Sequence, residues 1–389
     1  MLTAPPTFSQ DTSSAQSSLQ IDAGLTIALN DGEKSDVFAD LEARFEWENI
    51  TQEGRRYGFV LAGRAERDPG RAGWGGAAGN CPDGLADCAG DGAGDVLRGV
   101  TSGFYAAHSG QSDPLRGALT HAFGYVHMGY GEVRLGYGDG AARLDAVAPP
   151  TAFRLSRADN GRVDITGLSG SRTYNYASGQ APKLVLRSIA LGQARSIGSF
   201  RGSLSYTPEA NGCGVDYCDH APGASGVLSA DIENIVEAGL FYELHRGETE
   251  LSFSLGYASG QSNSAVPVFE DLDVTNAGVR VQRGAWSGGV RWLSSNNATG
   301  GDYEALSASI ARESGDWLYT LEWSNFGDDT VHADGRSIQI GGSKLIGDHW
   351  LAGAGLQYAE RREAMISPLG RRHIEQDSTT FFLELGWRY

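Results

Sequence analysis

Seven arginines lie on the polar side of segments in which apolar and polar residues alternate. They are the first residues of this chain whose type and position suggest a function. A guanidinium stays charged at any working pH, and it binds carboxylates and phosphates instead of exchanging protons. A dry core could not accept such charges, whereas a solvent face or a water-filled interior could. A single arginine of this kind is most simply a solvated surface residue, but seven in different segments favour a wet interior. The seven are Arg44, Arg64, Arg134, Arg187, Arg201, Arg280 and Arg291.

Further charged residues occupy residues 139–182, a stretch that lacks strand periodicity. A structureless segment of about forty residues inside a compact protein usually has a function of its own. Asp145, Asp159 and Asp164 lie in it, together with several arginines. We therefore treat this segment as a candidate functional loop.

The four cysteines form two close pairs, Cys81 with Cys88 and Cys213 with Cys218. Neither pair has the CxxC spacing, and both are flanked by Asp and Gly, which is typical of surface loops. An even count at close spacing predicts two local disulfides in an oxidising compartment. Because His220 lies close to Cys218, a metal site at the second pair stays open as an alternative.

A Gly-rich stretch contains four evenly spaced aspartates, Asp83, Asp87, Asp91 and Asp95. Calcium takes several oxygen ligands, and an acidic loop can supply them. The spacing is not that of an EF-hand and no closing Glu follows. We expect solvated loop acids and no cofactor, with calcium in the outer loops as the alternative.

Enzyme motifs are missing from the sequence. GYGDG at 136–140 is not GxGxxG and follows no βαβ pattern, and the chain has no HExxH, GxSxG or P-loop. The eight histidines are scattered along the chain. We therefore expect a protein that is not an enzyme.

Charge and hydropathy exclude two further classes of protein. The formal net charge is −17 and the pI about 4.9, which argues against nucleic-acid binding. The mean hydropathy is −0.30, and no stretch approaches the ~18 apolar residues that a spanning helix needs. A membrane barrel stays open, because its strands alternate lipid-facing with lumen-facing residues.

Runs of about ten residues with period two recur along the chain. In 248–257, apolar Leu251, Phe253, Leu255 and Tyr257 alternate with polar or small residues, and 37–47 and 317–323 repeat the pattern. Aromatic residues close many apolar rows, as in the girdles of membrane barrels. These residues are Trp47, Tyr57, Tyr257, Trp286, Trp292, Trp317, Trp323, Trp350 and Trp387.

Sixteen strands are predicted, joined alternately by short turns and long polar loops. The longest loops are 68–118, 139–182 and 208–232, and further loops are expected at 259–271, 294–301, 326–336 and 362–376. A seventeenth candidate at 95–107 is assigned to a loop, because an even count places every short turn on one rim. Residues 1–18 lack the features of a signal peptide and are expected to be a flexible segment of a mature chain, with one barrel over 19–389. The predicted strands are 19–30, 37–48, 56–67, 117–128, 131–138, 183–191, 198–207, 233–245, 248–258, 272–282, 285–294, 302–313, 316–325, 337–346, 349–361 and 377–389.

Two segments resemble the Gram-negative general diffusion porins. LTHAFGYVHMGYGEVRLGYGDG at 119–140 resembles the strand–turn–strand that runs into the porin constriction loop. TTFFLELGWRY at the C-terminus resembles the outer-membrane assembly signal, with a final Tyr in place of the usual Phe. The signal residues are Phe381, Leu383, Leu385, Trp387 and Tyr389.

The resemblance implies an all-β, transmembrane antiparallel up-and-down barrel of sixteen strands with a long inward-folded constriction loop at 139–182. It further implies a homotrimer in the bacterial outer membrane, whose water-filled pore passes small hydrophilic solutes and ions by passive diffusion. Wall arginines would face loop acids across the constriction, and Arg134 and Arg187 are the first candidates because they flank the loop. The acidic excess predicts a mild cation preference.

Two alternatives remain at this point. A substrate-specific channel for sugar or phosphate would line the same barrel with aromatic side chains, for which Phe241 and Phe382 are candidates if they face inward. A soluble sandwich or solenoid acting as an adhesin would show the same period of two. It would, however, expose apolar patches of a size that is rare on soluble monomers.

Overall fold

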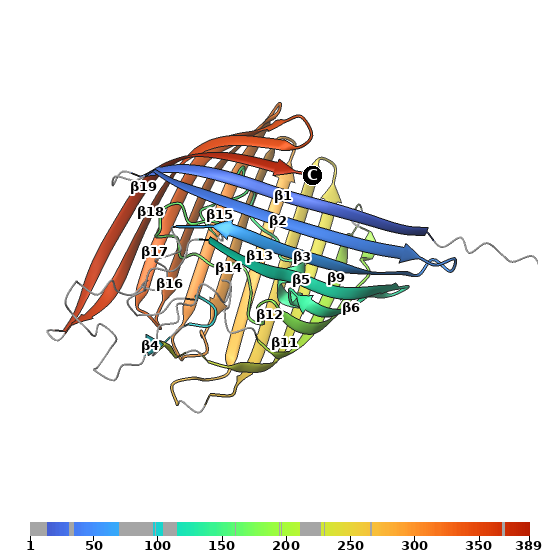
Figure 1. Ribbon diagram of the computed structural model, residues 1–389, viewed down its shortest axis with the longest axis horizontal. Helices are drawn as coiled ribbons and strands as arrows, with labels where there is room; N and C mark the ends of the chain where they lie inside the picture. The colour runs from blue at the N-terminus through green and yellow to red at the C-terminus, as the bar shows by residue number, and fades with distance from the viewer. Residues whose placement is uncertain are drawn as a thin grey trace, which may run out of the picture.

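Sixteen antiparallel strands pair with their neighbours into one closed barrel in the computed structural model of the chain (Figure 1). The structure describes residues 14–389 except 31–34, 70–95, 98, 104–114, 160, 194, 196, 211–226, 229, 265–266 and 368–369. The barrel strands are β1 (Ser14–Asn30), β2 (Ser35–Ile50), β3 (Arg56–Arg67), β5 (Leu115–Met128), β6 (Gly131–Gly138), β7 (Ala181–Ser188), β9 (Gly198–Glu209), β11 (Ile232–Arg246), β12 (Thr249–Ser262), β13 (Leu272–Arg283), β14 (Trp286–Ser295), β15 (Tyr303–Ser314), β16 (Trp317–Asp328), β17 (Ala333–Ile346), β18 (Trp350–Ser367) and β19 (Gly370–Arg388).

The first and last strands close the barrel. β1 pairs with β2 on one side and with β19 on the other, in a register that runs from Asp22 opposite Arg388 to Asn30 opposite Thr380. Figure 1 shows β1 in blue and β19 in red lying side by side at this seam. Closure leaves no free sheet edge, so every strand finds hydrogen-bond partners on both sides.

Four small elements accompany the barrel. β8 (Leu191–Gln193) adds a short pairing to β9, and β4 (Val96–Leu97) pairs in parallel with β10 (Val227–Leu228). α1 (Ala141–Leu144) is a single helical turn after β6. Across the described residues, no helix is long and apolar enough to cross a bilayer.

Alternation along each strand separates an exposed apolar face from a buried polar face. In β19, Phe381, Leu383 and Leu385 are exposed, whereas Phe382 and Glu384 between them are buried. The same holds in β16, where Trp317, Tyr319 and Leu321 are exposed. The apolar rows therefore cover the surface of the barrel instead of packing into a core. The sandwich or solenoid alternative is wrong at the level of the fold.

Several short turns share one backbone conformation. Gly247, Gly284 and Gly315 have φ of +61°, +55° and +61°, and each is the first residue of a two-residue turn. A glycine with positive φ at this place is typical of type II′ hairpins, whose twist matches that of the strands. The dipeptides GE, GA and GD thus set the register at one rim.

The predicted strands agree with the observed ones to within a few residues, with three corrections. β1 begins at Ser14, so residues 14–18 belong to a strand paired with β2. The loops predicted at 326–336 and 362–376 are mostly strand, because β16–β17 and β18–β19 continue beyond the membrane-like apolar rows as polar ladders. Hydrophobic alternation fades there while the backbone pairing continues.

The remaining predictions on the outer loops can be followed only in part. Within 95–112, residues 96–97 and 99–103 are described and contribute no barrel strand, which agrees with the even count. The two cysteine pairs, His220 and the aspartates at 83, 87, 91 and 95 lie outside the described residues.

Candidate functional site

The segment between β6 and β7, residues 139–180 and called here the long loop, lies against the polar face of the barrel wall. Near its start, the backbone N–H of Ala141 donates to Ser205 Oγ of β9 at 2.9 Å. Further on, the N–H of Val147 donates to Ser254 Oγ of β12 at 2.8 Å. The hydroxyls of these strands therefore satisfy backbone N–H groups at the first turn of α1 and in the irregular segment that follows it.

Two buried carboxylates hold the middle of the long loop. Glu384 of β19 accepts the backbone N–H groups of Arg154, Leu155 and Ser156 at 2.6, 3.2 and 3.0 Å. Glu322 of β16 accepts the N–H of Ala158 at 3.2 Å and the hydroxyl of Thr151 at 2.5 Å. A carboxylate that collects several N–H donors acts like the cap of a helix, and bonds to a charged acceptor are the strong ones.

Polar side chains of the wall also donate to carbonyl oxygens of the long loop. Ser343 donates to Ala152 at 2.6 Å, and Gln339 donates to the carbonyl of Ser156 at 3.1 Å. Both side chains are buried. Polar side chains at alternate strand positions thus form hydrogen bonds with the loop and not with solvent.

A row of glycines in the wall lets the loop backbone approach closely. A Cβ at Gly256 of β12 would lie 2.7 Å from the carbonyl oxygen of Ala142, and one at Gly289 of β14 would lie 3.0 Å from Pro149 Cα. Gly239 of β11 and Gly278 of β13 would likewise place a methyl against the carbonyls of Ala141 and Val147. These four positions, called the glycine track, have room for the loop because they carry no side chain.

An apolar cluster fixes the far half of the long loop. Phe153 of the loop packs edge-on against Phe382 of β19, with ring centroids 4.8 Å apart. Leu155 and Ile165 of the loop and Phe38 of β2 belong to the same buried cluster. Phe382, one of the two candidates for an aromatic lining, is therefore covered by the loop.

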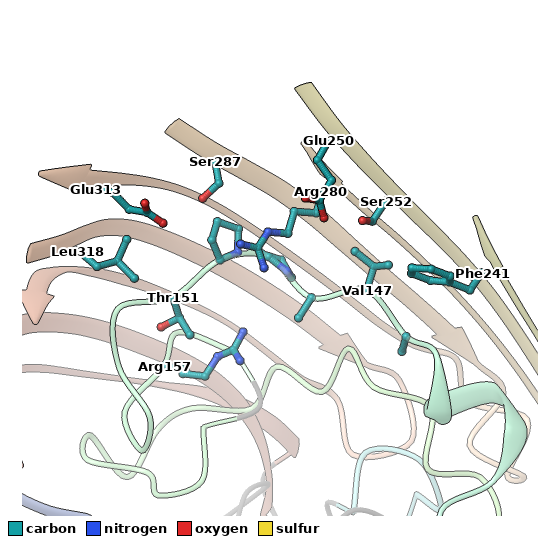
Figure 2. A pocket seen from close by; sticks show the side chains of 14 residues that line it. Val147, Thr151, Arg157, Phe241, Glu250, Ser252, Arg280, Ser287, Glu313 and Leu318 are labelled. Atoms are coloured by element: carbon teal, nitrogen blue, oxygen red, sulfur yellow. The ribbon is translucent and has the colours of Figure 1, made fainter. Parts of the chain in front are cut away.

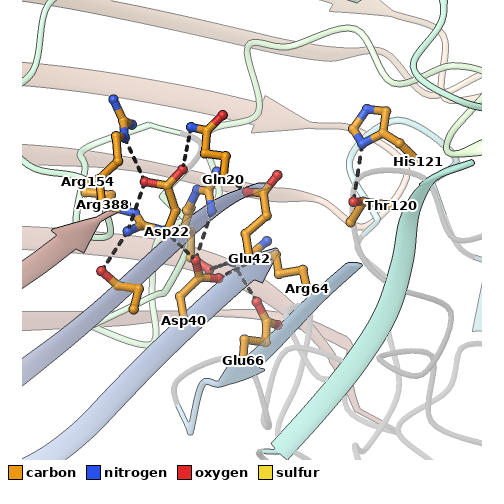
Figure 3. A network of polar contacts seen from close by, with 12 residues as sticks. Gln20, Asp22, Asp40, Glu42, Arg64, Glu66, Thr120, His121, Arg154 and Arg388 are labelled. Atoms are coloured by element: carbon orange, nitrogen blue, oxygen red, sulfur yellow. Dashed lines mark hydrogen bonds and ion pairs between the residues drawn. The ribbon is translucent and has the colours of Figure 1, made fainter. Parts of the chain in front are cut away.

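Around Asp40 of β2, three arginines converge, as Figure 3 shows in part. Asp40 forms ion pairs with Arg64 of β3, with Arg162 Nη1 at 2.9 Å and with Arg154 Nη2 at 3.4 Å. The Asp40 side chain is 0% exposed, and the side chains of Arg64, Arg154 and Arg162 are 13%, 14% and 34% exposed. Here the acid lies on the wall and two of the arginines lie on the loop.

The neighbouring acids complete this group. Asp22 of β1 binds Arg388 at 2.8 Å and lies 3.6 Å from Arg154, and Glu42 of β2 binds Arg162 at 2.7 Å. We call Asp22, Asp40, Glu42, Arg64, Arg154 and Arg162 the Asp40 network.

On the opposite side, the polarity is reversed at Asp145. This loop residue follows α1 and forms ion pairs with Arg187 of β7 and with Arg201 Nη1 of β9 at 3.3 Å. The two arginine side chains stay 25% and 32% exposed. Wall arginines thus face a loop acid here, as the sequence predicts.

A third cluster is fully covered by the loop. Arg291 of β14 is 1% exposed and stacks on the Tyr174 ring, with its Cζ 3.6 Å from the ring centroid. Asp159 lies close by and binds Arg157 at 3.2 Å. Burial alone raises the pKa of Asp159, but the guanidiniums of Arg157 and Arg291 outweigh it and lower that pKa to about 2.

A cavity of about 450 Å³ lies between the loop and the wall. Figure 2 shows Arg280, Glu250 and Ser252 of the wall and Val147 and Thr151 of the loop around it. Charged side chains with free volume beside them are what a water-filled space requires.

The structure places the other predicted residues as follows. Arg44 pairs with Glu46 of its own strand at 3.4 Å. Arg134 pairs with Glu132 and lies 5.1 Å from the Phe123 ring, so its ion pair is with the wall. Asp164 accepts the backbone N–H groups of Thr166, Gly167 and Ser169 in a turn of the loop. The ten predicted residues therefore fall into separate groups and do not form one ring.

The acids of the wall were not among the residues predicted from the sequence. Asp22, Asp40 and Glu42 take part in the Asp40 network, and Glu322 and Glu384 hold the loop backbone. Their signal was an acid in the middle of an apolar alternating strand, as in LYTLEWS and FFLELGW. The predicted pore residues on the wall are all arginines at such positions, and none of these acids is among them.

Comparisons with solved structures identify the fold. OmpT, an outer membrane protein of Vibrio cholerae in its trimer form, is 10% identical with a TM-score of 0.52 and covers 96% of this chain and 99% of its own. The anion-selective porin from Comamonas acidovorans is 13% identical with a TM-score of 0.52, covering 97% and 100%. A third structure, a porin, is 12% identical with the same TM-score, covering 96% and 100%.

Sequence comparisons give no counterpart to this likeness, since no family model matches the chain and no curated sequence matches it significantly. At such low identity the structures establish the sixteen-stranded porin fold and nothing finer. The predicted fold class and the resemblance to porins are confirmed at that level.

Proposed function

Starting from a chain with the sixteen-stranded porin fold, we propose an outer-membrane channel that passes small hydrophilic solutes and ions by passive diffusion. The observation that carries the proposal is the division between the two faces of the strands. Exposed leucines, phenylalanines and tryptophans cover the outside of the barrel, and the charged face holds the long loop and a cavity.

The outer face has the character of a lipid-facing surface. Rows such as Phe381, Leu383 and Leu385 would form an apolar patch far larger than soluble monomers expose. Trp317, Trp350 and Trp387 lie near the rim of short turns, where an aromatic girdle is expected. This supports a place in the bacterial outer membrane.

Inside the barrel, we propose that the long loop narrows the pore. It is held by buried hydrogen bonds and the Asp40 network, while Arg187 and Arg201, which pair with the largely buried Asp145, remain partly exposed. Facing charges across a narrow aqueous gap set a transverse field that favours polar solutes. The predicted mild cation preference follows from the acidic excess of the chain, and salt limits it to the narrow part because screening acts over ~8–10 Å.

Reconstitution into planar bilayers tests the proposal. The folded protein should give stepwise conductance in KCl, and liposomes that contain it should swell in small sugars faster than in large ones. A reversal potential in a salt gradient reports the cation preference. Absence of conductance from folded protein, or a protein that stays monodisperse in buffer without amphiphile, would contradict it.

We infer a homotrimer by analogy with the Vibrio cholerae protein, whose structure is described as a trimer form. Chemical cross-linking in native membranes should yield a species of three chains. A monomer across all cross-linker concentrations would rule this out.

A substrate-specific channel is the second candidate, favoured by Phe241. Its ring lines the cavity, and Arg201 lies 5.8 Å from the ring centroid. An aromatic ring beside arginines could bind a sugar or a phosphate. Saturation of the flux with sugar or phosphate concentration, abolished by Phe241→Ala, would select this candidate over free diffusion.

A further inference from the structure

Glu243, His245 and Glu250 bring three ligating side chains together at the end of the β11–β12 hairpin. One possible ligand atom from each side chain lies within 4.8 Å of the other two. Among the described residues, these three form the one group of three or more His, Cys, Asp or Glu side chains that could hold a metal ion. Glu243 and His245 are two residues apart on β11 and therefore share a face. Glu250 lies directly opposite His245 in the register with β12.

The three groups are held by backbone that cannot move far. The turn between the strands is two residues long, with Gly247 at φ +61°, so the register at His245 is fixed. His245 Nε2 lies 2.5 Å from Glu243 Oε1, and the two side chains are 38% and 31% exposed. Two carboxylates and one imidazole thus leave a net negative site open to water.

The charged neighbours offset this excess only in part. Arg201 of β9 lies along the same wall, but it pairs with Asp145 at 3.3 Å. Arg280 of β13 is opposite Ser252 in register, one step along the polar face from Glu250, and it also lines the cavity. On β13, the residue opposite Glu250 itself is the uncharged Gln282.

We propose that Glu243, His245 and Glu250 bind a divalent transition metal ion such as Zn²⁺. An imidazole among the ligands selects zinc or copper over magnesium and calcium, which prefer all-oxygen sites. Three protein ligands with a fourth position left to water are a common zinc arrangement. Because Glu250 also lines the cavity, the open position can be reached from the solvent there.

This binding does not depend on conduction, so the test measures the metal directly. Folded protein in detergent, with its cysteines blocked by iodoacetamide, is titrated with Zn²⁺ against a chromophoric chelator. Loss of an outer partner of a metal ligand weakens binding about 10–100-fold, and loss of a ligand should weaken it at least as much. We expect this for His245→Ala and for Glu250→Gln.

His127 provides a matched control. It also faces a glutamate across a strand pair, Glu132, at 3.0 Å, but the other carboxylate oxygen of Glu132 binds Arg134. His127→Ala should leave the zinc affinity within about twofold of wild type. Heat-modifiable migration on gels checks that each variant is folded, and Glu250→Gln, which keeps the side-chain shape, tests the site if His245→Ala fails to fold.

Equal zinc affinity in wild type, His245→Ala and Glu250→Gln would overturn the proposal. So would an equal loss in His127→Ala, because the binding would then be general surface binding. A loss confined to the hairpin variants supports the site whether or not the barrel conducts.

Discussion

The two sides of the long loop are attached to the barrel wall with opposite polarity. At β1–β3 the wall supplies the acids Asp22 and Asp40 and the loop supplies Arg154 and Arg162. At β7–β9 the wall supplies Arg187 and Arg201, and the loop supplies Asp145. Both sides contain ion pairs, so the presence of charge does not distinguish them.

Burial differs between the two sides, though not for every residue. The Asp40 and Asp145 side chains are 0% and 6% exposed. The Arg64 and Arg154 side chains are 13% and 14% exposed, against 25% and 32% for Arg187 and Arg201, and Arg162 at the edge of the Asp40 network is 34% exposed. A buried pair that loses one partner leaves an uncompensated charge, whereas an exposed pair is screened by water. We therefore expect the Asp40 network to hold the loop in place and the Asp145 side to face the solute.

The largest effect is expected for Asp40→Ala. It leaves three arginines without their shared carboxylate, and breaking a buried pair in this way costs about 3–5 kcal/mol. The loop should detach on the β1–β3 side, with higher single-channel conductance and faster proteolysis within 139–180.

Arg336→Ala is the control for Asp40→Ala. Arg336 pairs with Glu360 at 2.8 Å but is 56% exposed, so its loss should change neither conductance nor proteolysis. An Asp40→Ala protein with the wild-type conductance would remove the mounting role from the network.

Glu384→Gln is expected to act less strongly, by about 1–3 kcal/mol, because the charge that accepts three backbone N–H groups is lost. Hydrogen exchange should rise at Arg154, Leu155 and Ser156 before it rises in β19. Unchanged exchange at these amides would show that the carboxylate does not hold the loop.

Gly278→Val tests the glycine track at a cost of about 1–3 kcal/mol, because side-chain atoms would overlap the carbonyl of Val147. The loop should move away from β13 and alter the conductance. At Gly202 an added Cβ meets nothing within 4 Å, so Gly202→Val is the matched control. Equal behaviour of the two variants would contradict close packing of the loop.

The smallest effect on stability, about 0–1 kcal/mol, is expected for Arg187→Ala and Arg201→Ala. Removing positive charge beside the solute path should shift the reversal potential toward cation selectivity while the barrel still assembles. An unchanged reversal potential in both variants would exclude these residues from the constriction.

The barrel could be predicted almost completely from the sequence, because each strand carries its own evidence. Alternation in a strand such as 248–257 gives both its existence and the face that is apolar, and turn glycines such as Gly247 set its ends. The start of β1 and the polar extensions of β16 to β19 escaped, since apolar periodicity ends at the edge of the apolar belt while pairing continues.

The candidate site could be predicted only in part, because the path of the long loop carries no periodicity. Alternation places Arg134 and Arg187 on the same face, yet one pairs with its own strand and the other with the loop. The same limit applies to Glu384 and Phe382, which belong to the loop contacts and not to an open lining. Which wall residues a loop covers depends on contacts distant in sequence.

Single-channel recording of wild type beside Asp40→Ala and Arg201→Ala is the sharpest test of the two roles proposed for the long loop. We expect stepwise conductance in wild type and a larger step in Asp40→Ala. In Arg201→Ala we expect an unchanged step size with greater cation selectivity. A wild type that does not conduct, or two variants that alter step and selectivity alike, would contradict a loop that is mounted on one side and lines the pore on the other.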